Sequence, residues 1–496
     1  MKLCEQLSDK GGISLSQLMD NAGEALARQV LEICMRRGLK KCLILAGKGN
    51  NGGDGFVAAN LLADSSMEVT VMLPVGEPGT ELAKAAFSKL NSAVKIADSA
   101  FRQEFVSQFD IIIDCVFGTG FHGSLDEKFA RLFALCNQSS ALRIACDVPS
   151  GCDASSGLAD ENSFKADLTV TFHKKKLGLA LSPCRYFCGE VITADIGIDE
   201  SLEDGYKVTL CDEEYVKGVL PQRVPYGNKG TFGKVTAVCG SDRYIGAAAM
   251  SVMGALRTGV GLCELCSTQK TVAALSSSIF ECIYTTLSVD SEGCISPDSA
   301  QAVIEKSRSS SCILIGCGLG NTKGTQQLVA DIIQGSECPV VIDADGINSL
   351  AVNIDVLQKK KSDVILTPHP MELARLCSKP LEQVLSDRLG AARDIAEKYT
   401  VTVLAKSAES MAVTKEGCVL ISAGNTALAK GGSGDMLAGI TASLLAQGCT
   451  PADACAAASF IMGSTAQMLC QRVSPRSVLA RDILSSIGEY LMTLEG

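Results

Sequence analysis

A glycine cluster that runs straight into a helix-like segment, at residues 429–439 (AKGGSGDMLAG), constrains the fold of this chain more than any other stretch. Its apolar residues recur at helical spacing after the glycines. The pattern predicts a loop leading into a helix N-terminus, where unpaired N–H groups and the helix dipole favour an anion such as phosphate. Asp435 stands beside that position, where it could accept a proton from a hydroxyl group. The alternative is that Asp435 only caps its own helix.

A second glycine loop, at residues 47–55 (GKGNNGGDG), lies between an apolar run at 41–46 and a helix-like run at 56–63. A strand, a glycine loop and a helix in this order can hold a nucleotide phosphate, although the loop matches neither GxGxxG nor Walker A. Asn50, Asn51 and Asp54 add oxygens that suit an alkali or alkaline-earth cation. The alternative is a turn rich in Asn and Gly without a ligand.

The N-terminal half alternates strand-like and helix-like stretches, which predicts a parallel, doubly wound sheet. Ligands bind such sheets outside the carboxyl ends of the strands, so Asn51, Asp114, Asp147 and Ser150 should share one crevice. Each Asp taken singly could instead cap its own loop. Further strands are predicted at 69–73, 110–116, 143–148 and 168–173. Helices are predicted at 12–38, with Ser16 as cap and Gly38 as end, at 80–91 and at 127–137.

A domain boundary is expected near residue 212. Residues 199–228 are charged, contain prolines and lack strong periodicity, and 496 residues at about 100–200 per domain require at least two domains. We therefore expect domains at 1–212 and 213–496. Just before this passage, the lysine run at 174–176 is typical of a solvated face.

The C-terminal half repeats the alternation, with strands expected at 312–315, 340–342, 364–366 and 401–405. Stretches rich in glycine, proline and polar residues again follow the strand ends, at 316–320, 343–348, 367–372 and 406–410. Lys406 could neutralise phosphate charge, and His369 lies between two prolines that restrict its backbone. We expect His369 to contact a ligand, with a purely structural histidine as the alternative.

Charge and composition exclude several classes of partner. The net charge is -10, so the chain has no sequence-wide basic field for nucleic acid or an anionic membrane. No apolar run approaches the 18 or so residues of a membrane span, and the start has no signal core, so we expect a cytoplasmic protein. The 23 cysteines are scattered singly, and the one CxxC, Cys263–Cys266, lacks a second pair, which predicts buried thiols.

With these motifs in view, nearly the whole chain resembles the bifunctional NAD(P)H-hydrate repair enzymes, in which an epimerase domain is fused to a dehydratase domain. The resemblance implies a Rossmann-like doubly wound N-terminal domain and a ribokinase-like α/β C-terminal domain. It rests on these motifs: MDNAG (19–23), GKGNNGGDG, DCVFGTG (114–120), DVPSG (147–151), KGTFG (229–233), ALRTGVG (255–261), GCGLG (316–320), DAD (343–345), TPHP (367–370) and GGSGD (431–435).

In the N-terminal half, the resemblance implies potassium ligands at Asn51, Asp114 and Ser150. Asp147, at a strand end near the bound cation, is the candidate group for proton transfer in epimerisation. The implied hydrate-binding positions are Asn50, Asn51, Gly52, Gly53, Asp54, Gly118, Thr119, Gly120, Phe121, His122, Gly123, Ser124 and Asp147.

In the C-terminal half, the resemblance implies hydrate binding at Ala248, Gly318, His369 and Asp435. The implied nucleotide-binding positions are Lys406, Ser407, Ala408, Glu409, Ser410 and Gly434. The family usually has LysGlyAlaGly where this chain has LysSerAlaGlu, so Glu409 should repel a diphosphate unless its side chain points away. Cys317 stands where a proline is usual.

The implied reaction is the repair of hydrated NADH or NADPH by an isomerase and a lyase in one chain. The N-terminal domain would interconvert the R and S hydrates. The C-terminal domain would use ADP, with ATP as the alternative and with Mg2+, to phosphorylate the S hydrate while Asp435 removes the hydroxyl proton. We expect these small molecules as partners, with potassium in the epimerase domain, and a homo-oligomer.

A different function remains open at this stage. The C-terminal half could be a ribokinase-like kinase of a small alcohol, such as a vitamin precursor, because the same anion site would serve it. The N-terminal half could then be a non-catalytic nucleotide-sensing module. Accumulation of a phosphorylated product without elimination would favour that alternative.

Overall fold

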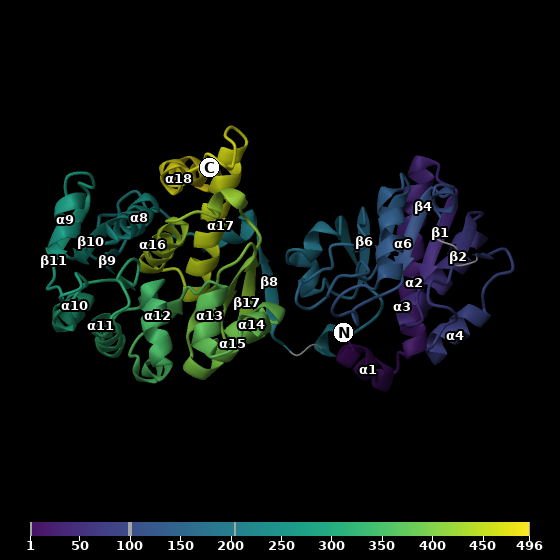
Figure 1. Ribbon diagram of the computed structural model, residues 1–496, viewed down its shortest axis with the longest axis horizontal. Coiled ribbons are helices and arrows are strands. Elements are labelled where there is room, and N and C mark those ends of the chain that lie inside the picture. Colours follow the sequence, from purple (N-terminus) through teal and green to yellow (C-terminus); the bar gives the residue numbers. More distant parts are fainter. Residues whose placement is uncertain (1, 98–101, 203–204, 496) are drawn as a thin grey trace. The chain divides into compact units, whose positions relative to one another are not determined.

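The computed structural model describes residues 2–97, 102–202 and 205–495. The chain divides into two compact units, Met1–Gly205 and Tyr206–Gly496. Figure 1 shows that each unit is a sheet with helices on both of its faces, as the alternating sequence pattern predicted. The α/β fold class is therefore confirmed for both halves.

The N-terminal unit contains a seven-stranded sheet in the order β3-β2-β1-β4-β5-β6-β7, with every neighbouring pair parallel. The order turns outward in both directions from β1, which is the doubly wound arrangement. The strands are β1 (Lys41–Ala46), β2 (Glu68–Met72), β3 (Lys95–Ala97), β4 (Ile111–Cys115), β5 (Leu142–Cys146), β6 (Leu168–Phe172) and β7 (Glu190–Ala194).

The predicted cap of the long N-terminal helix is wrong by two residues. Ser14, in an extended backbone conformation, accepts a hydrogen bond from Gln17 N at 3.2 Å, while Ser16 lies within the first turn. Gly38 ends the helix in a left-handed conformation (φ 70), as predicted. The helices of this unit are α1 (Lys2–Gly11), α2 (Leu15–Arg37), α3 (Asn50–Asp64), α4 (Glu81–Ser88), α5 (Gln103–Val106) and α6 (Glu127–Gln138).

Two apolar cores cover the two faces of this sheet. α2 and α3 contribute Leu26, Val30 and Phe56 to one core, and α6 contributes Phe129 and Phe133 to the other. Burial on both faces explains why the strands are almost continuously apolar. Polar residues are therefore concentrated where the strands end.

The C-terminal unit contains a ten-stranded sheet in the order β11-β10-β9-β12-β13-β14-β15-β16-β17-β8. β16 is antiparallel to both of its neighbours, and β8 pairs with β17 in parallel. Residues 207–211 thus extend the second sheet, although the sequence pattern assigned them to the first domain. The strands are β8 (Lys207–Cys211), β9 (Lys234–Val238), β10 (Leu262–Ser267), β11 (Cys282–Thr286), β12 (Cys312–Ile315), β13 (Val340–Ile342), β14 (Val364–Leu366), β15 (Thr402–Ala405), β16 (Ser410–Val413) and β17 (Gly417–Ile421).

Two helices of this unit approach each other closely and carry predicted site residues. α8 and α16 meet at Gly439, where a side-chain Cβ would lie 2.0 Å from Ser251 O, so only glycine allows the contact. Thr450 caps α17, with Pro451 in its first turn, as predicted. The helices are α7 (Glu213–Val219), α8 (Ile245–Arg257), α9 (Gln269–Leu275), α10 (Ala300–Ser307), α11 (Lys323–Gly335), α12 (Asp345–Val352), α13 (Pro370–Cys377), α14 (Leu381–Ser386), α15 (Arg388–Tyr399), α16 (Ser433–Ala446), α17 (Pro451–Cys470) and α18 (Ala480–Glu495).

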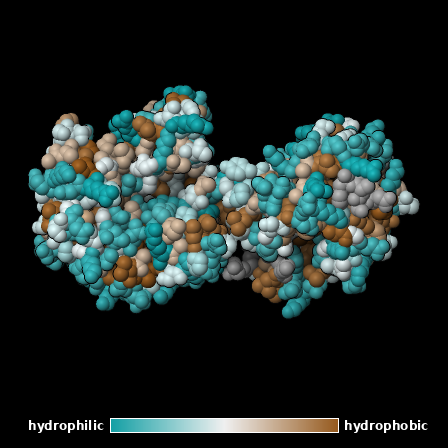
Figure 2. Space-filling view, viewed as in Figure 1, coloured by the Kyte–Doolittle hydropathy of each residue, from teal (hydrophilic) through white to brown (hydrophobic). Residues whose placement is uncertain are grey.

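The cysteines are mostly buried free thiols, as the scattered pattern predicted. Cys263 and Cys266 of the CxxC lie within strand β10 and are fully buried. Within the described ranges, no helix is both long enough and apolar enough to cross a lipid bilayer. The surface in Figure 2 accordingly mixes hydrophilic and hydrophobic side chains over both units.

Candidate active sites

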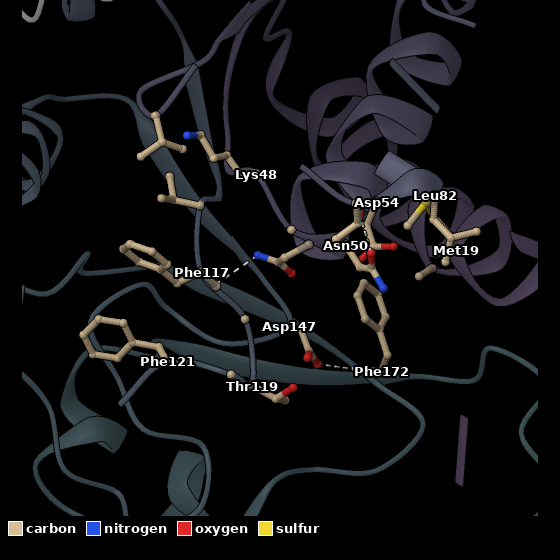
Figure 3. Close-up of a pocket in the computed structure, with 18 of the residues that line it drawn as sticks. Met19, Lys48, Asn50, Asp54, Leu82, Phe117, Thr119, Phe121, Asp147 and Phe172 are labelled. Carbon is tan, nitrogen blue, oxygen red and sulfur yellow. Dashed lines mark hydrogen bonds between the residues drawn. The ribbon is translucent and has the colours of Figure 1, made fainter. Parts of the chain in front are cut away.

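A cavity of about 910 Å³ lies in the N-terminal unit, beside the first turn of α3 and the loops after β4 and β5. Figure 3 shows its lining side chains. Most of the predicted hydrate-binding residues contribute to its wall: Asn50, Asn51, Asp54, Gly118, Thr119, Gly120, Phe121, His122 and Asp147. Four predicted residues, Gly52, Gly53, Gly123 and Ser124, do not line it.

Gly52 and Gly53 have a packing role that explains the glycine loop. A Cβ at Gly52 would lie 2.1 Å from Gly47 O, and a Cβ at Gly53 would lie 2.5 Å from the Met19 side chain. The glycines therefore allow α3 to begin close to the end of β1. This close start brings Asn50, Asn51 and Asp54 to the cavity.

Asp147 is anchored at the end of β5 by a lysine. Its backbone is left-handed (φ 64), which is uncommon for a residue with a side chain. Its Oδ1 accepts hydrogen bonds from Lys176 Nζ at 2.5 Å, Thr171 Oγ1 at 3.1 Å and Phe172 N at 3.2 Å. Three donors on one oxygen, one of them an ammonium group, hold the carboxyl group in place. Asp147 is thus a fixed negative group on the cavity wall.

The lysine run at 174–176 is only in part the solvated face that the sequence predicted, since Lys174 and Lys175 are exposed but Lys176 is not. The Lys176 side chain is only 8% exposed because it forms the buried pair with Asp147. His173, with a left-handed backbone (φ 63), turns the chain after β6 and so directs Lys176 back to the strand ends. Lys174 is 48% exposed and pairs with Glu200, so that lysine does face solvent.

The three predicted potassium ligands lie near one another behind this cavity. Ser150 Oγ donates to Asp114 Oδ1 at 2.7 Å and accepts from Phe117 N at 2.9 Å, while Asn51 Nδ2 donates to Phe117 O at 3.0 Å. Asp114 is 0% exposed, and burial raises its pKa to about 6 although Ser150 donates to it. Among the described residues, no basic side chain forms an ion pair with Asp114. The donor set is oxygen-rich and suits a hard cation.

His122, one of the predicted hydrate contacts, belongs to the rim of the cavity. Its Nδ1 lies 2.7 Å from Asp153 Oδ2, and its side chain is largely exposed. The predicted position on the cavity wall is therefore observed, with the ring oriented by a carboxylate.

The C-terminal unit brings a thiol and two carboxylates together at the carboxyl ends of its strands. Cys317 follows β12, Asp343 follows β13 and Asp435 lies in the first turn of α16, with ligand atoms within 4.8 Å of one another. Asp343 Oδ1 accepts hydrogen bonds from Lys406 Nζ and Thr367 Oγ1, both at 2.6 Å. Thr367 follows β14 and Lys406 follows β15, so five elements meet at this cluster.

Asp435 has the environment of a base that works near neutral pH. Burial, followed by the charge of Asp343, raises its pKa to about 6, while the Cys317 thiol and Lys406 oppose the shift. Its helix is capped by Gly432 without a side-chain hydrogen bond, so the alternative that Asp435 is only a cap does not hold. The carboxylate remains available to accept a proton.

The start of α16 has the positive character predicted for an anion site. Gly432 has a left-handed backbone (φ 92), which leads the loop into the helix. A Cβ at Gly434 would lie 3.7 Å from Lys406 Nζ, so the lysine adjoins the first turn. Free N–H groups, the helix dipole and an ammonium therefore converge beside Asp435.

His369 is held by its own helix. As the N-cap of α13, its Nδ1 accepts hydrogen bonds from Met371 N and Glu372 N at 3.2 and 3.3 Å. Its Nε2 lies 3.3 Å from Glu372 Oε1, and burial, Lys406 and Arg375 lower its pKa. Half of the side chain is exposed, so ligand contact by the ring stays a prediction.

Glu409, which the resemblance expected to repel a diphosphate unless it pointed away, is directed into the protein. It is 2% exposed, and Arg388 donates to its carbonyl oxygen at 3.3 Å. Burial lowers the pKa of Arg388, and the charge of Glu409 opposes this shift. The neighbouring Ser407 and Ala408 are exposed, so the face of the 406–410 loop that meets solvent carries no acid.

The other two predicted contacts lie where α8 meets the loop after β12. Ala248, a residue of α8, is fully buried in the core of the C-terminal unit. Gly318 has a left-handed backbone (φ 64), and a Cβ there would lie 2.7 Å from the Ala247 Cβ. These residues shape the backbone around the cluster.

Sequence reasoning did not identify the partners of the central acids. Asp343, Thr367 and Glu372 all belong to motifs after strand ends, but their types alone do not reveal that Asp343 binds Lys406. Burial raises the pKa of Glu372 to about 7, which marks it as part of the same electrostatic cluster. Asp343, Thr367 and Glu372 could have been predicted from their positions after strand ends, which is how Asp147 was predicted.

Together, these features define a two-domain α/β enzyme, with a doubly wound domain and a ribokinase-like domain that each carry a buried acid–lysine pair. Residues 15–178 match the family described as YjeF-related protein N-terminus, and residues 235–489 match the family described as NAD(P)H-hydrate dehydratase. Both halves therefore have relatives of their own.

Several relatives match along the whole length. The bifunctional NAD(P)H-hydrate repair enzyme Nnr of Moorella thermoacetica is 31% identical, with 96% of this chain and 92% of the relative covered. The enzyme of that name from Escherichia coli strain K12 is 30% identical, with 97% and 90% covered. The crystal structure of the ADP/ATP-dependent NAD(P)H-hydrate dehydratase from Bacillus subtilis, co-crystallized with ATP/Mg2+, is 26% identical (TM-score 0.50) and covers 58% of this chain and 99% of its own.

The chain belongs to the family of bifunctional NAD(P)H-hydrate repair enzymes. Its function is the repair of hydrated NADH and NADPH, by an epimerase domain and a dehydratase domain. The ribokinase-like fold expected for the C-terminal half is confirmed.

Proposed function

We propose that the N-terminal cavity is the epimerase site and that the cluster around Asp435 is the dehydratase site. One observation supports this division: each unit has its own buried acid–lysine pair at the carboxyl ends of parallel strands. The two pairs are Asp147–Lys176 at 2.5 Å and Asp343–Lys406 at 2.6 Å. Each pair adjoins residues that resemble the binding motifs of the corresponding family domain.

In the epimerase site, Asp147 exchanges a proton with the hydrate. Its Oδ1 is held by three donors, while its Oδ2 accepts no hydrogen bond from any described residue. The free oxygen is therefore the one that takes the substrate's proton. Phe117, Phe121 and Phe172 provide apolar surface on the same cavity wall, suited to a nicotinamide ring.

Potassium fits the oxygen cluster formed by Asn51, Asp114 and Ser150. Asp114 is a fully buried carboxylate without a basic partner among the described residues, and a monovalent cation would supply the missing charge. When bound, the ion would hold the loops after β4 and β5 in place. Exchanging potassium for the larger choline ion should lower epimerase activity, and an unchanged rate would reject the site.

In the dehydratase site, Asp435 removes the proton of the substrate hydroxyl as its oxygen attacks the terminal phosphorus of the nucleotide. The bond from that phosphorus to the bridging oxygen breaks, and the nucleotide leaves with one phosphate fewer. The start of α16 and Lys406 stabilise the charge on the transferred phosphoryl group. The new phosphate ester then leaves as phosphate when the neighbouring ring carbon loses a proton and the double bond forms. Lys406, Ser407, Ala408, Glu409, Ser410 and Gly434 are the proposed nucleotide-contact positions.

We propose ADP, bound with Mg2+, as the phosphoryl donor, because the fused arrangement resembles the bacterial enzymes. ATP is the alternative, and parallel assays with each nucleotide separate the two. Assembly into a homo-oligomer stays a prediction.

The decisive test uses the full-length protein and purified R and S hydrates. Asp147→Asn should stop interconversion of the epimers while leaving nucleotide-dependent recovery of NADH from the S hydrate unchanged. Asp435→Asn should have the reciprocal effect. Loss of both activities in either variant, with the fold intact, would contradict two separate sites.

A further inference from the structure

Among the acids of the epimerase cavity, Asp54 stands out because the described part of the chain provides no partner for it. It lies in the first turn of α3 and lines the cavity with Asp147. Among the described residues, none donates a hydrogen bond to its carboxyl group or forms an ion pair with it. Figure 3 shows both carboxyl groups on the cavity wall beside Phe172.

The two acids have opposite electrostatic environments. Asp147 is surrounded by donors, including the Lys176 ammonium at 2.5 Å. Burial raises the pKa of Asp54 well above its usual value, and the negative charges of Asp147 and Glu5 raise it further, while Lys176 opposes them. Two carboxyl groups in opposite environments on one cavity wall are the usual arrangement of an acid–base pair.

The chemistry of the hydrate requires both partners. Water adds to an enamine double bond with its oxygen on the carbon bonded to nitrogen, because nitrogen stabilises positive charge there. Inverting that carbon means breaking one of its bonds and reforming it from the other face. Opening the C–N bond and closing it on the other face inverts the carbon without expelling the oxygen, so this route needs no phosphoryl group.

We infer that Asp54 is the general acid of the epimerase reaction and acts in concert with Asp147. In the opening step, Asp147 takes the hydroxyl proton, the C–O bond becomes a carbonyl, and the C–N bonding electrons pass to nitrogen, which receives the proton of Asp54. After rotation about the adjacent C–C bond, nitrogen attacks the opposite carbonyl face. Asp54 then recovers its proton from nitrogen, and Asp147 returns its proton to oxygen.

Neither oxidant nor co-reactant is needed, since every proton and electron pair returns to its origin. The inference rests on the proposed assignment of this cavity to epimerisation. It also explains why Asp54 stands on the helix that faces Asp147: proton donor and acceptor must reach the substrate from different elements. A mere binding contact would not need a carboxyl group that lines the cavity without a basic partner.

The test is Asp54→Asn in the full-length protein, with Asp64→Asn as the matched control. Asp64 lies at the other end of α3, exposed and outside the cavity. Asp54→Asn should lower the kcat of epimer interconversion by about 10²-fold to 10⁴-fold, with a much smaller change in KM. Asp64→Asn should leave kcat unchanged, and nucleotide-dependent dehydration of the S hydrate should be normal in both variants.

A pH profile separates an acid from a binding residue. Wild-type kcat should decline at high pH as Asp54 loses its proton, and Asp54→Asn should lack that decline. The charges that face Asp54 are those of Asp147, Glu5 and Lys176. The other titratable groups of the cavity wall are Lys48, His122, Asp126 and Lys128, which both variants retain.

Asp54→Glu keeps the carboxyl group and should recover part of the lost rate. An unchanged kcat in Asp54→Asn, an effect on KM alone, or equal rates in the Asn and Glu variants would overturn the inference. The outcome for the proposed function is separate: it fails if the wild-type protein does not interconvert the epimers or if Asp147→Asn remains fully active.

Discussion

Asp435→Asn removes one carboxylate from the dehydratase cluster and changes its size very little. With a pKa of about 6, Asp435 is about nine-tenths ionised at pH 7 and about one-tenth ionised at pH 5. Wild-type dehydration should therefore fall about tenfold for each pH unit well below 6. Because the base must be ionised, activity is lost as pH falls and kept as pH rises.

The asparagine variant should lower the rate of dehydration by about 10²-fold to 10⁴-fold, which is about 2.7–5.5 kcal/mol of transition-state stabilisation. The assay follows the return of dihydronicotinamide absorbance from the S hydrate with ADP or ATP. Epimer interconversion, measured in the same preparation by chromatography, should not change. Asp394→Asn, which replaces an exposed acid paired with Lys379, serves as the matched control.

The pH at which the dehydration rate falls on the acidic side of its profile (the acid limb) gives a second, independent check. Asp343 contributes to the raised pKa of Asp435, and Lys406 opposes it. Asp343→Asn removes the negative charge that raises the pKa of Asp435 and releases Lys406 from its ion pair. The pKa of Asp435 should therefore fall, and the acid limb should move to lower pH. A dehydration rate in Asp435→Asn above about a tenth of wild type, or an acid limb that persists unchanged in this variant, would refute the assignment of Asp435 as base.

The remaining predictions concern one lysine, one glycine and the nucleotide. Lys176→Met should lower the free energy of unfolding by about 3–5 kcal/mol, because it leaves the buried charge of Asp147 unpaired. Lys174→Met, at an exposed ion pair, should change this free energy by less than about 1 kcal/mol. Urea unfolding measures both variants. Gly432→Ala should cost about 1–2 kcal/mol because a left-handed backbone (φ 92) disfavours a side chain, seen as a lower Tm. ADP at about 100 times its Kd should stabilise the protein by about 2.7 kcal/mol, and Lys406→Met should remove most of that shift in thermal unfolding.

The parts of the fold that were predictable depend on local signals. The apolar strands, the two glycine loops and the start of α17 at Thr450 follow from periodicity and turn chemistry within a few residues. The position of polar residues after strand ends then predicted the site of Asp147, and the glycine cluster before a helix predicted that of Asp435. These inferences needed only the rule that parallel strands present their carboxyl ends at one edge.

The parts that were missed depend on partners far along the chain. Lys176 is buried because Asp147, 29 residues earlier, neutralises it. β8 belongs to the second sheet because its register matches β17, about 200 residues later. Glu409 turns inward beside Arg388, an arrangement that no local pattern signals. Such pairings are set by the tertiary structure, so residue type and spacing do not predict them.

The two units contain the same kinds of groups at their sites, but different surroundings make one carboxyl group a proton acceptor and another a proton donor. Each site has a carboxylate neutralised by a lysine, Asp147 or Asp343, and a second carboxyl group without a lysine, Asp54 or Asp435. At Asp435 the Cys317 thiol and Lys406 limit the shift, which leaves a pKa of about 6 and a base at neutral pH. At Asp54 burial and the charges of Asp147 and Glu5 raise the pKa, with Lys176 opposing them, which suits a proton donor. The roles therefore follow from the partners of the second carboxyl group, and a new positive charge beside Asp54 should convert it from donor to acceptor and stop epimerisation.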